Sequence, residues 1–171
     1  MTGLKDPQGV RGECRWTLRG PDGRIKTHGV NHNLITQVGD QVYGERGAGI
    51  AGAPNAPTGM KLGTGSTATA KTGAGAALVT YLSTSQHAFD STFPTSTLSS
   101  SSRRITYKCT YVAGEATTAT PIAEAVIVNE TLTNATSAAS ATIARVLVSP
   151  TVVKAAGDSL TLTWTADLLG S

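Results

Sequence analysis

Strict alternation of apolar and polar residues is the feature of this sequence that most constrains its fold. In the segment "SLTLTWTADL", Leu160, Leu162 and Trp164 alternate with threonines, and "RRITYKCTYV" shows the same period. Successive side chains of a β-strand point to opposite faces, so a period of two predicts strands with one buried side and one side that faces solvent or a partner. The segments "IAEAVIVN" and "ATIARVLVS" add further predicted strands.

The composition favours the same fold class. Of the 171 residues, 39% are hydrophobic and only 15% are charged, and much of the polarity comes from Ser, Thr, Gly and Asn. Thr and Val favour extended backbone, whereas Gly and Asn favour turns. We therefore expect an all-β protein: a single β-sandwich of jelly-roll or immunoglobulin-like topology, with one short helix and long loops rich in Gly, Ser and Thr.

The chain is predicted to form one domain preceded by an arm. Residues 1–12 are the expected N-terminal arm, and residues 13–171 are the expected β-sandwich domain, which is long enough to bury a core. Residues 13–30 predict a hairpin, because strand-like alternation resumes after the turn sequence "GPDG".

The one predicted helix follows this hairpin. Leu34, Ile35, Val38 and Val42 fall on one helical face behind Asn33, which is a candidate N-cap. Capping residues of this type accept hydrogen bonds from the first free backbone N–H groups of a helix. The sequence therefore predicts a short helix that ends at the glycines beyond Val42.

Two long segments are predicted to be loops. Residues 47–77 are mostly Gly, Ala, Pro and Thr, apart from a strand-like stretch at residues 60–62, and residues 83–102 hold too few apolar side chains for a regular element. Loops of this length exceed the usual median of about 4–6 residues. We expect such segments to be disordered in isolation or to cover the surface of a partner.

The two cysteines, Cys14 and Cys109, are predicted to be buried free thiols. Each lies in a strand-like stretch, and a chain of this length does not need a disulfide. The first ten residues contain no apolar signal segment, and no stretch approaches the roughly 20 apolar residues of a membrane span. We therefore expect synthesis in a cytoplasm and no membrane partner.

Charge is unevenly distributed along the chain, although the net charge is only +3. Five cations gather in the middle of the sequence: Lys61, Lys71, Arg103, Arg104 and Lys108. Five acids dominate the last third: Glu115, Glu124, Glu130, Asp158 and Asp167. One interpretation is an ordinary mottled surface, and the other is head-to-tail electrostatic matching between copies. Without a concentrated basic face, this charge does not indicate direct nucleic-acid binding.

The stretch "MKLGTGSTATAKTG", residues 60–73, resembles a phosphate-binding loop only in part. Such a loop needs a glycine directly before the lysine, and Ala70 stands there before Lys71. The residues after Lys71 are also a poor start for a helix, whose N-terminus would face the phosphate. We therefore expect no nucleotide cofactor at this stretch.

The remaining candidate sites are weak as well. His28 and His32 are four residues apart, but no third ligand is near, so we expect surface histidines and no metal. Glu115 and Glu124 have a spacing that permits a catalytic carboxylate pair on neighbouring strands, yet charges at the surface of a hairpin explain them more simply. No serine has the context of a nucleophile.

Tyr107 and Tyr111 flank Lys108, an arrangement that nucleic-acid platforms use. The alternation places both tyrosines on the face opposite Lys108, so we expect them in the core. No catalytic, cofactor-binding or metal residues are predicted, and the chain is not expected to be an enzyme.

Several segments in order resemble virion structural proteins of tailed double-stranded-DNA bacteriophages. The resemblance covers most of residues 13–169 and rests on the "PDG" turn, "NLIT", "MKLGTGST", "AGEAT", the "IAEA" segment and "ARVLVSPTVVKAAGDSLTLTW". Such proteins include capsid decoration, minor capsid and tail components. The resemblance implies a β-sandwich that attaches to a repeating protein lattice without a cofactor, with Gly63 and Gly65 allowing a sharp turn beside a strand.

The resemblance leads to a functional expectation. It favours a capsid decoration (cement) protein, expected to be a homotrimer, that binds the major capsid protein lattice on the outer surface of the phage head. Met1–Glu13 and residues 83–102 are the predicted interface elements. The alternatives are a tail, neck or baseplate protein, or a carbohydrate- or receptor-binding module that meets a host-surface glycan. The last alternative would be expected to expose more Trp and Tyr than this chain offers.

Overall fold

The computed structural model of the chain describes residues 9–99 and 102–169. Nine strands, one short α-helix and three single turns of other helix types lie within these residues. The strands are β1 (Gly9–Arg19), β2 (Ile25–Ile35), β3 (Gly59–Gly63), β4 (His87–Ala88), β5 (Thr95–Ser99), β6 (Ser102–Tyr111), β7 (Ile122–Val128), β8 (Thr142–Val152) and β9 (Ser159–Leu169). The helical elements are α1 (Gln37–Gln41), the π-helical η1 (Val42–Arg46), and the 3₁₀ turns η2 (Gly73–Ala76) and η3 (Ala139–Ala141).

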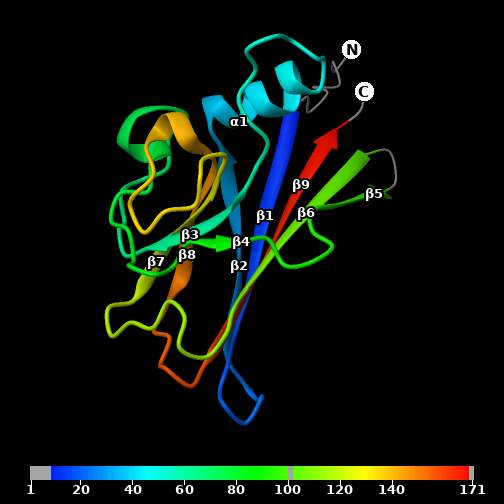
Figure 1. Cartoon of the computed structure of the whole chain (residues 1–171). Helices are drawn as coiled ribbons and strands as arrows, with labels where there is room; N and C mark the ends of the chain where they lie inside the picture. The colour runs from blue at the N-terminus through cyan, green and yellow to red at the C-terminus, as the bar shows by residue number, and fades with distance from the viewer. Residues whose placement is uncertain (1–8, 100–101, 170–171) are drawn as a thin grey trace, which may run out of the picture.

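The strands form one antiparallel sheet in the order β4-β3-β7-β8-β2-β1-β9-β6-β5. Strand β2 pairs with β1 along most of its length, but with β8 only through Leu34 and Ile35. The sheet can bend where pairing is this short, and it curls into a half-barrel (Figure 1). The predicted β-rich class with one short helix is therefore confirmed, in the form of one continuous curled sheet.

The concave side of the curled sheet holds the core. Trp16, Trp164 and Leu162 are all at most 2% exposed, and they pack with the apolar faces of β3, β7 and β8. Trp16 lies across Gly29 of β2, where a Cβ atom would come within 2.5 Å of the indole ring. The alternation in β1 and β9 thus fixes which face of each strand is buried.

A short segment around β4 connects distant strands of the curled sheet. β4 pairs with β3, and the backbone N–H of Asp90 donates to the carbonyl of Lys108 on β6 at 2.8 Å. The Asp90 carboxylate also accepts from the N–H of Thr110 at 2.8 Å. In Figure 1 this segment crosses from β3 toward β6. It therefore ties the β3 side of the half-barrel to the β6 side.

The hairpin predicted at residues 13–30 is confirmed, but the predicted helix is shifted. Asn33 lies in β2, and the N-cap is Thr36, whose Oγ1 accepts from the N–H of Gly39 at 3.1 Å. Leu34 and Ile35 belong to β2 because they pair with β8. Gly39 is required where α1 contacts β8, since a Cβ atom there would lie 2.2 Å from a carbonyl oxygen.

The loop predictions are partly wrong. Residues 83–102 contain β4 and β5, because Thr and Leu at positions 95–99 suit an edge strand that β6 can pair. Residues 47–77 are largely irregular and contain β3, as the strand-like stretch at 60–62 predicted. The predicted arm overlaps β1 at residues 9–12, which pair with β9, and residues 1–8 lie outside the described residues.

Cys14 and Cys109 are both buried free thiols, in agreement with the sequence. Burial raises the pKa of each thiol far above its ordinary value. A thiol that stays protonated is a poor nucleophile, so both cysteines act as core residues. Within the described residues, no helix has the length and apolar character needed to cross a membrane.

Candidate functional site

The outer face of β2, β1, β9 and β6 carries polar side chains in cross-strand rows. The core takes the alternate residues of these strands, so the others point to the convex side. The register places Arg15 beside Thr163, and Thr163 beside Lys108 on the next strand. The adjacent row runs through Glu13, Thr165 and Thr106. We call this convex surface the outer face.

A groove of about 250 Å³ opens at one end of the outer face. Four strands contribute to it, and its charged and polar side chains are Arg11, Glu13 and Arg15 of β1, His32 of β2, Arg104 of β6, and Thr165 and Asp167 of β9. β1, β6 and β9 are far apart in the sequence, and only the insertion of β9 between β1 and β6 brings their side chains together. We call it the arginine groove.

Two ion pairs occupy the arginine groove. Arg104 donates from Nε to Asp167 Oδ1 at 2.7 Å and from Nη2 to Asp167 Oδ2 at 2.9 Å. Arg15 Nε lies 2.6 Å from Glu13 Oε1. The hydrogen bonds from Arg104 hold the pKa of the Asp167 carboxyl below its usual value, and those bonds and the charge of Asp167 raise the pKa of Arg104. Both pairs remain partly open to solvent.

The opposite side of the half-barrel holds a fully buried ion pair. Arg145 of β8 donates from Nε and Nη2 to Glu124 Oε2 of β7, at 3.0 and 2.7 Å, and both side chains are 0% exposed. Glu124 Oε1 also accepts from the backbone N–H groups of Gly65 and Thr80, at 3.1 and 2.8 Å. Arg145 Nη1 donates to the carbonyl of Thr67 at 2.7 Å.

This buried pair explains the glycines of the stretch at residues 60–73. Residues 64–80 pass over Glu124 and Arg145, and a Cβ atom at Gly63 or Gly65 would lie 2.6 or 2.5 Å from Glu124 Oε1. Neither glycine has a positive φ. The expectation that they permit a sharp turn is therefore wrong: they permit a close approach of the backbone to a buried carboxylate.

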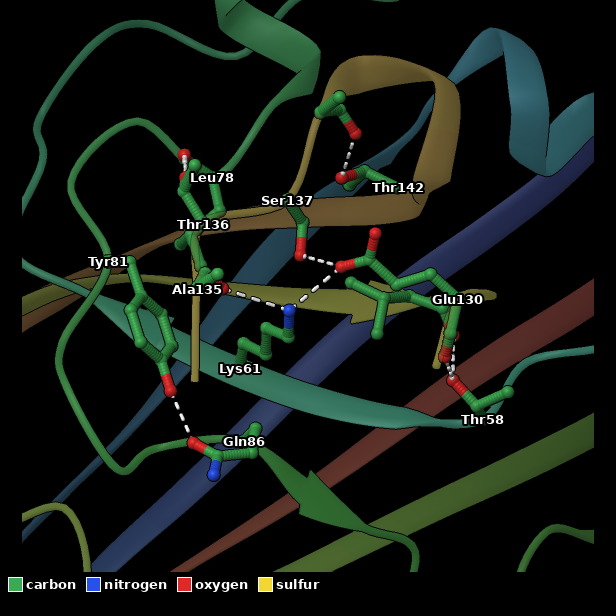
Figure 2. A network of polar contacts seen from close by, with 12 residues as sticks. Thr58, Lys61, Leu78, Tyr81, Gln86, Glu130, Ala135, Thr136, Ser137 and Thr142 are labelled. Carbon is green, nitrogen blue, oxygen red and sulfur yellow. Dashed lines mark hydrogen bonds and ion pairs between the residues drawn. The ribbon is translucent and has the colours of Figure 1, made fainter. Parts of the chain in front are cut away.

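A second buried cation lies on β3 (Figure 2). Lys61 is 0% exposed, and its Nζ donates to Glu130 Oε1 at 2.8 Å and to the carbonyl of Ala135 at 2.9 Å. Ser137 Oγ donates to the same carboxylate oxygen, and the Tyr81 ring lies 5.7 Å from the Lys61 ammonium. These contacts fix the segment that follows β7 against β3, so the Lys61 cluster has a structural role.

Lys154 and Asp158 form a third polar cluster near the β8–β9 turn. Lys154 Nζ donates to the carbonyl of Val112 at 2.9 Å, and burial lowers the pKa of this lysine. Asp158 is 1% exposed and accepts from Lys26 Nζ on β2 at 2.9 and 3.0 Å. Hydrogen bonds from Lys26 lower the pKa of Asp158. This cluster links the turn to β2 and to the end of β6.

The acids of the last third are mostly engaged within the chain. The four internal ion pairs are Glu124–Arg145, Glu130–Lys61, Asp158–Lys26 and Asp167–Arg104. Glu115 lies 3.6 Å from His87 Nε2. These residues therefore do not form an acidic surface that could match the basic middle segment of a second copy. The alternative, a mottled solvated surface, also fails for the buried members of these pairs.

The other predicted candidates are not brought together. His28 and His32 are exposed on β2, opposite Thr17 and Glu13. Residues separated by four positions along a strand lie about 13 Å apart, too far for one metal ion. Within residues 9–99 and 102–169, no group of three or more His, Cys, Asp or Glu could hold a metal.

Glu115 and Glu124 have separate partners. Glu115 accepts from the N–H of Val112, whereas Glu124 is buried against Arg145. The expectation that both are surface charges of a hairpin is wrong for Glu124, because its strand is buried on both faces. Tyr107 and Tyr111 are 2% and 0% exposed, which confirms their place in the core.

Sequence reasoning missed the arginine groove and the buried pair. A usable signal existed for the pair, because Glu124 and Arg145 are the single charges within two apolar runs, "IAEAVIV" and "ATIARVLV". A lone charge in such a run predicts a buried partner. The groove had no comparable signal, since its residues meet only through the order of the strands.

Comparisons with protein-family models, with curated proteins and with solved structures found no match to this chain.

Proposed function

We propose that this chain is a bacteriophage virion structural protein, a decoration (cement) protein that binds the outer surface of the head and stabilises the shell. The observation that carries the proposal is the outer face: β1, β9 and β6 present threonines and basic side chains, and β2 presents His28 and His32, on one convex surface. The resemblance of several segments, in their order along the chain, to virion proteins of tailed bacteriophages supports the same role. A protein that works by docking needs such a surface and no reaction centre.

The physical role of such a protein is to add binding free energy to a lattice. A capsid must resist the pressure of its packaged DNA, and a small protein that bridges neighbouring subunits strengthens the shell without altering the shell protein. Many weak contacts suffice when copies bind together, so a homotrimer on the major capsid protein lattice fits this role. A two-layer β-sandwich of jelly-roll or immunoglobulin-like topology remains part of the proposal.

The distribution of aromatic side chains favours lattice docking over glycan binding. All eight aromatic residues lie within the described residues, and none of them is exposed. Trp16 and Trp164, the best platforms for a sugar ring, are in the core. A carbohydrate- or receptor-binding module would present such rings on its surface.

The proposal is tested by mixing the purified protein with capsids that lack it and imaging them by cryo-electron microscopy. Ordered density at symmetry axes supports decoration. Bare shells overturn it, and density on isolated tails would then assign the chain to the tail, neck or baseplate.

A matched pair of variants tests the outer face. Thr163→Trp places a bulky ring at the centre of this face, between Arg15 and Lys108, and is expected to reduce occupancy on shells. Thr69→Trp makes the same change at an exposed loop position and is expected to bind normally. Equal occupancy of both variants would show that another surface docks.

A further inference from the structure

The arginine groove contains more guanidinium groups than carboxylates. Asp167 of β9 lies between Arg11 of β1 and Arg104 of β6 in the same cross-strand row. Both oxygens of Asp167 accept from Arg104, at 2.7 and 2.9 Å. Arg11 is exposed and makes no side-chain hydrogen bond or ion pair within the described part of the chain. One guanidinium of the row therefore has no anion.

The second carboxylate of the groove is engaged as well. Glu13 Oε1 lies 2.6 Å from Arg15 Nε, along the same strand. Three arginines thus share two carboxylates, each already held by another arginine. An arginine stays charged at any physiological pH, and its planar head donates two parallel hydrogen bonds to a carboxylate. Among residues 9–99 and 102–169, no carboxylate pairs with Arg11 in the groove.

We propose that the arginine groove binds a glutamate or aspartate side chain from an acidic segment of a partner protein, with Arg11 as its anchor. The inference rests on the proposed function, in which that partner is the shell lattice. The incoming carboxylate would extend the alternation of guanidinium and carboxylate across β1, β9 and β6. His32 and Thr165 line the same groove and offer further polar contacts.

The charge pattern favours a single carboxylate over a nucleic-acid backbone. A phosphate chain is bound by several cations that follow its path, and its affinity grows with the number of phosphates neutralised. Here Arg11 is the one arginine of the groove without a partner among the residues that the structure describes, while Glu13 and Asp167 would repel a polyanion. A protein segment with a few acidic side chains satisfies Arg11 without that repulsion.

The experiment uses two blocked heptapeptides, one with three glutamates and one with glutamines in their place. Each is titrated into the full-length protein at low salt, and binding is followed by backbone amide shifts in NMR spectra. The glutamate peptide is expected to shift signals of β1 and β9, and the glutamine peptide is not. Arg11→Gln is expected to lower the affinity for the glutamate peptide about tenfold, which is the effect expected from the loss of one charged hydrogen-bonded contact.

Arg24→Gln is the matched control. It removes the same charge from the hairpin tip, where the Arg24 side chain is 90% exposed and far along β2 from the groove. Its affinity for the glutamate peptide is expected to stay within about twofold of the parent protein, because solvent screens a distant exposed charge. Equal weakening by both variants, or binding of the glutamine peptide, would overturn the proposal.

Other occupants are excluded in the same titration. Displacement of the glutamate peptide by oligothymidylate would overturn the choice of a carboxylate. If the parent protein self-associates in sedimentation and Arg11→Gln abolishes this without any peptide binding, the occupant is a second copy and the proposal is wrong.

Co-sedimentation with undecorated shells separates this inference from the proposed function. Shell binding without peptide binding would overturn the groove proposal and leave decoration intact. Peptide binding without shell binding would support the groove chemistry and overturn decoration. If both hold, Arg11→Gln is expected to lower shell occupancy and Arg24→Gln is not.

Discussion

Each side of the half-barrel contains an ion pair between an arginine and a carboxylate, but one pair is buried and the other is exposed to solvent. Arg145 and Glu124 are fully buried; Glu124 accepts further hydrogen bonds from the loop that passes over them, and Arg145 donates to a carbonyl of that loop. Arg104 also donates two hydrogen bonds to its partner, one to each oxygen of Asp167, but these side chains are 42% and 23% exposed. A buried pair must be complete to be tolerated, whereas an exposed pair can exchange partners at little cost. The comparison therefore predicts that losing one partner costs more stability in the buried pair than in the exposed pair.

Breaking the buried pair is expected to have the largest effect. Arg145→Met leaves the Glu124 carboxylate buried without its cation and is expected to lower the free energy of unfolding by about 3–5 kcal/mol. Urea denaturation measures the loss. Replacing both residues, as in Glu124→Gln with Arg145→Met, should recover part of it. A loss below about 1 kcal/mol for the single variant would contradict the distinction between the two sides.

Disturbing the close approach of the loop to Glu124 is expected to have the next largest effect on stability. Gly65→Ala introduces a Cβ atom 2.5 Å from Glu124 Oε1 and is expected to lower the free energy of unfolding by about 1–3 kcal/mol, because the loop must shift. Gly44→Ala is the control, since a Cβ atom there meets nothing within 4 Å. Equal stability of the two variants in thermal denaturation would show that the loop is not held as described.

Acid should weaken the fold partly through Asp158. Hydrogen bonds from Lys26 lower the pKa of Asp158 in the folded state, so the unfolded state binds more protons as the pH falls. The contribution of Asp158 to stability is therefore present above the ordinary carboxyl pKa of about 4 and is lost as the pH falls through the lowered pKa. Asp158→Asn is expected to cost about 1–2 kcal/mol near pH 6 and to give a shallower decline of stability below pH 5. Melting temperatures from pH 7 to pH 2 test this.

Asp22→Asn is the control for the acid series, because Asp22 lies in the exposed turn of the first hairpin. Its stability curve should run parallel to that of the parent protein. If the Asp158→Asn curve is also parallel, Asp158 does not contribute to acid sensitivity.

Breaking the exposed pair is expected to have the smallest effect. Arg104→Gln should change the free energy of unfolding by less than about 1 kcal/mol, because solvent replaces its hydrogen bonds to Asp167. Urea denaturation under the conditions used for Arg145→Met gives a direct ratio between the two sides. Losses of similar size would mean that the outer pair is structural too.

Periodicity in the sequence predicted the strands well and their partners poorly. The alternation around Trp164 and Tyr107 identified both strands and their buried faces, because the period of a strand is a local property. The position of β9 between β1 and β6 depends on contacts between residues about 50 or more positions apart, and no local pattern encodes it. The arginine groove depends on that position, so it could not be predicted.

The predictions of the helix boundary and of the exposure of the charged residues were wrong for a related reason. Leu34 and Ile35 satisfy a helical pattern, but pairing with β8 keeps them in a strand. The interpretation of a mottled surface includes Lys61, because the sequence does not show that the segment around Ala135 covers this lysine. In each case, contact with a segment distant in the sequence determined the structure, and the local sequence pattern alone did not predict that contact.

The central position of β9 also constrains how the molecule can fold. The first hairpin, β1–β2, and the hairpin β5–β6 each form from nearby residues, but they share no edge until β9 pairs with both. Until residues 159–169 are in place, each hairpin presents an uncovered apolar face and an unpaired edge, which are the features that promote aggregation. Assembly therefore waits for the last strand, and the sheet should form slowly, as expected for a chain whose pairings span most of its length.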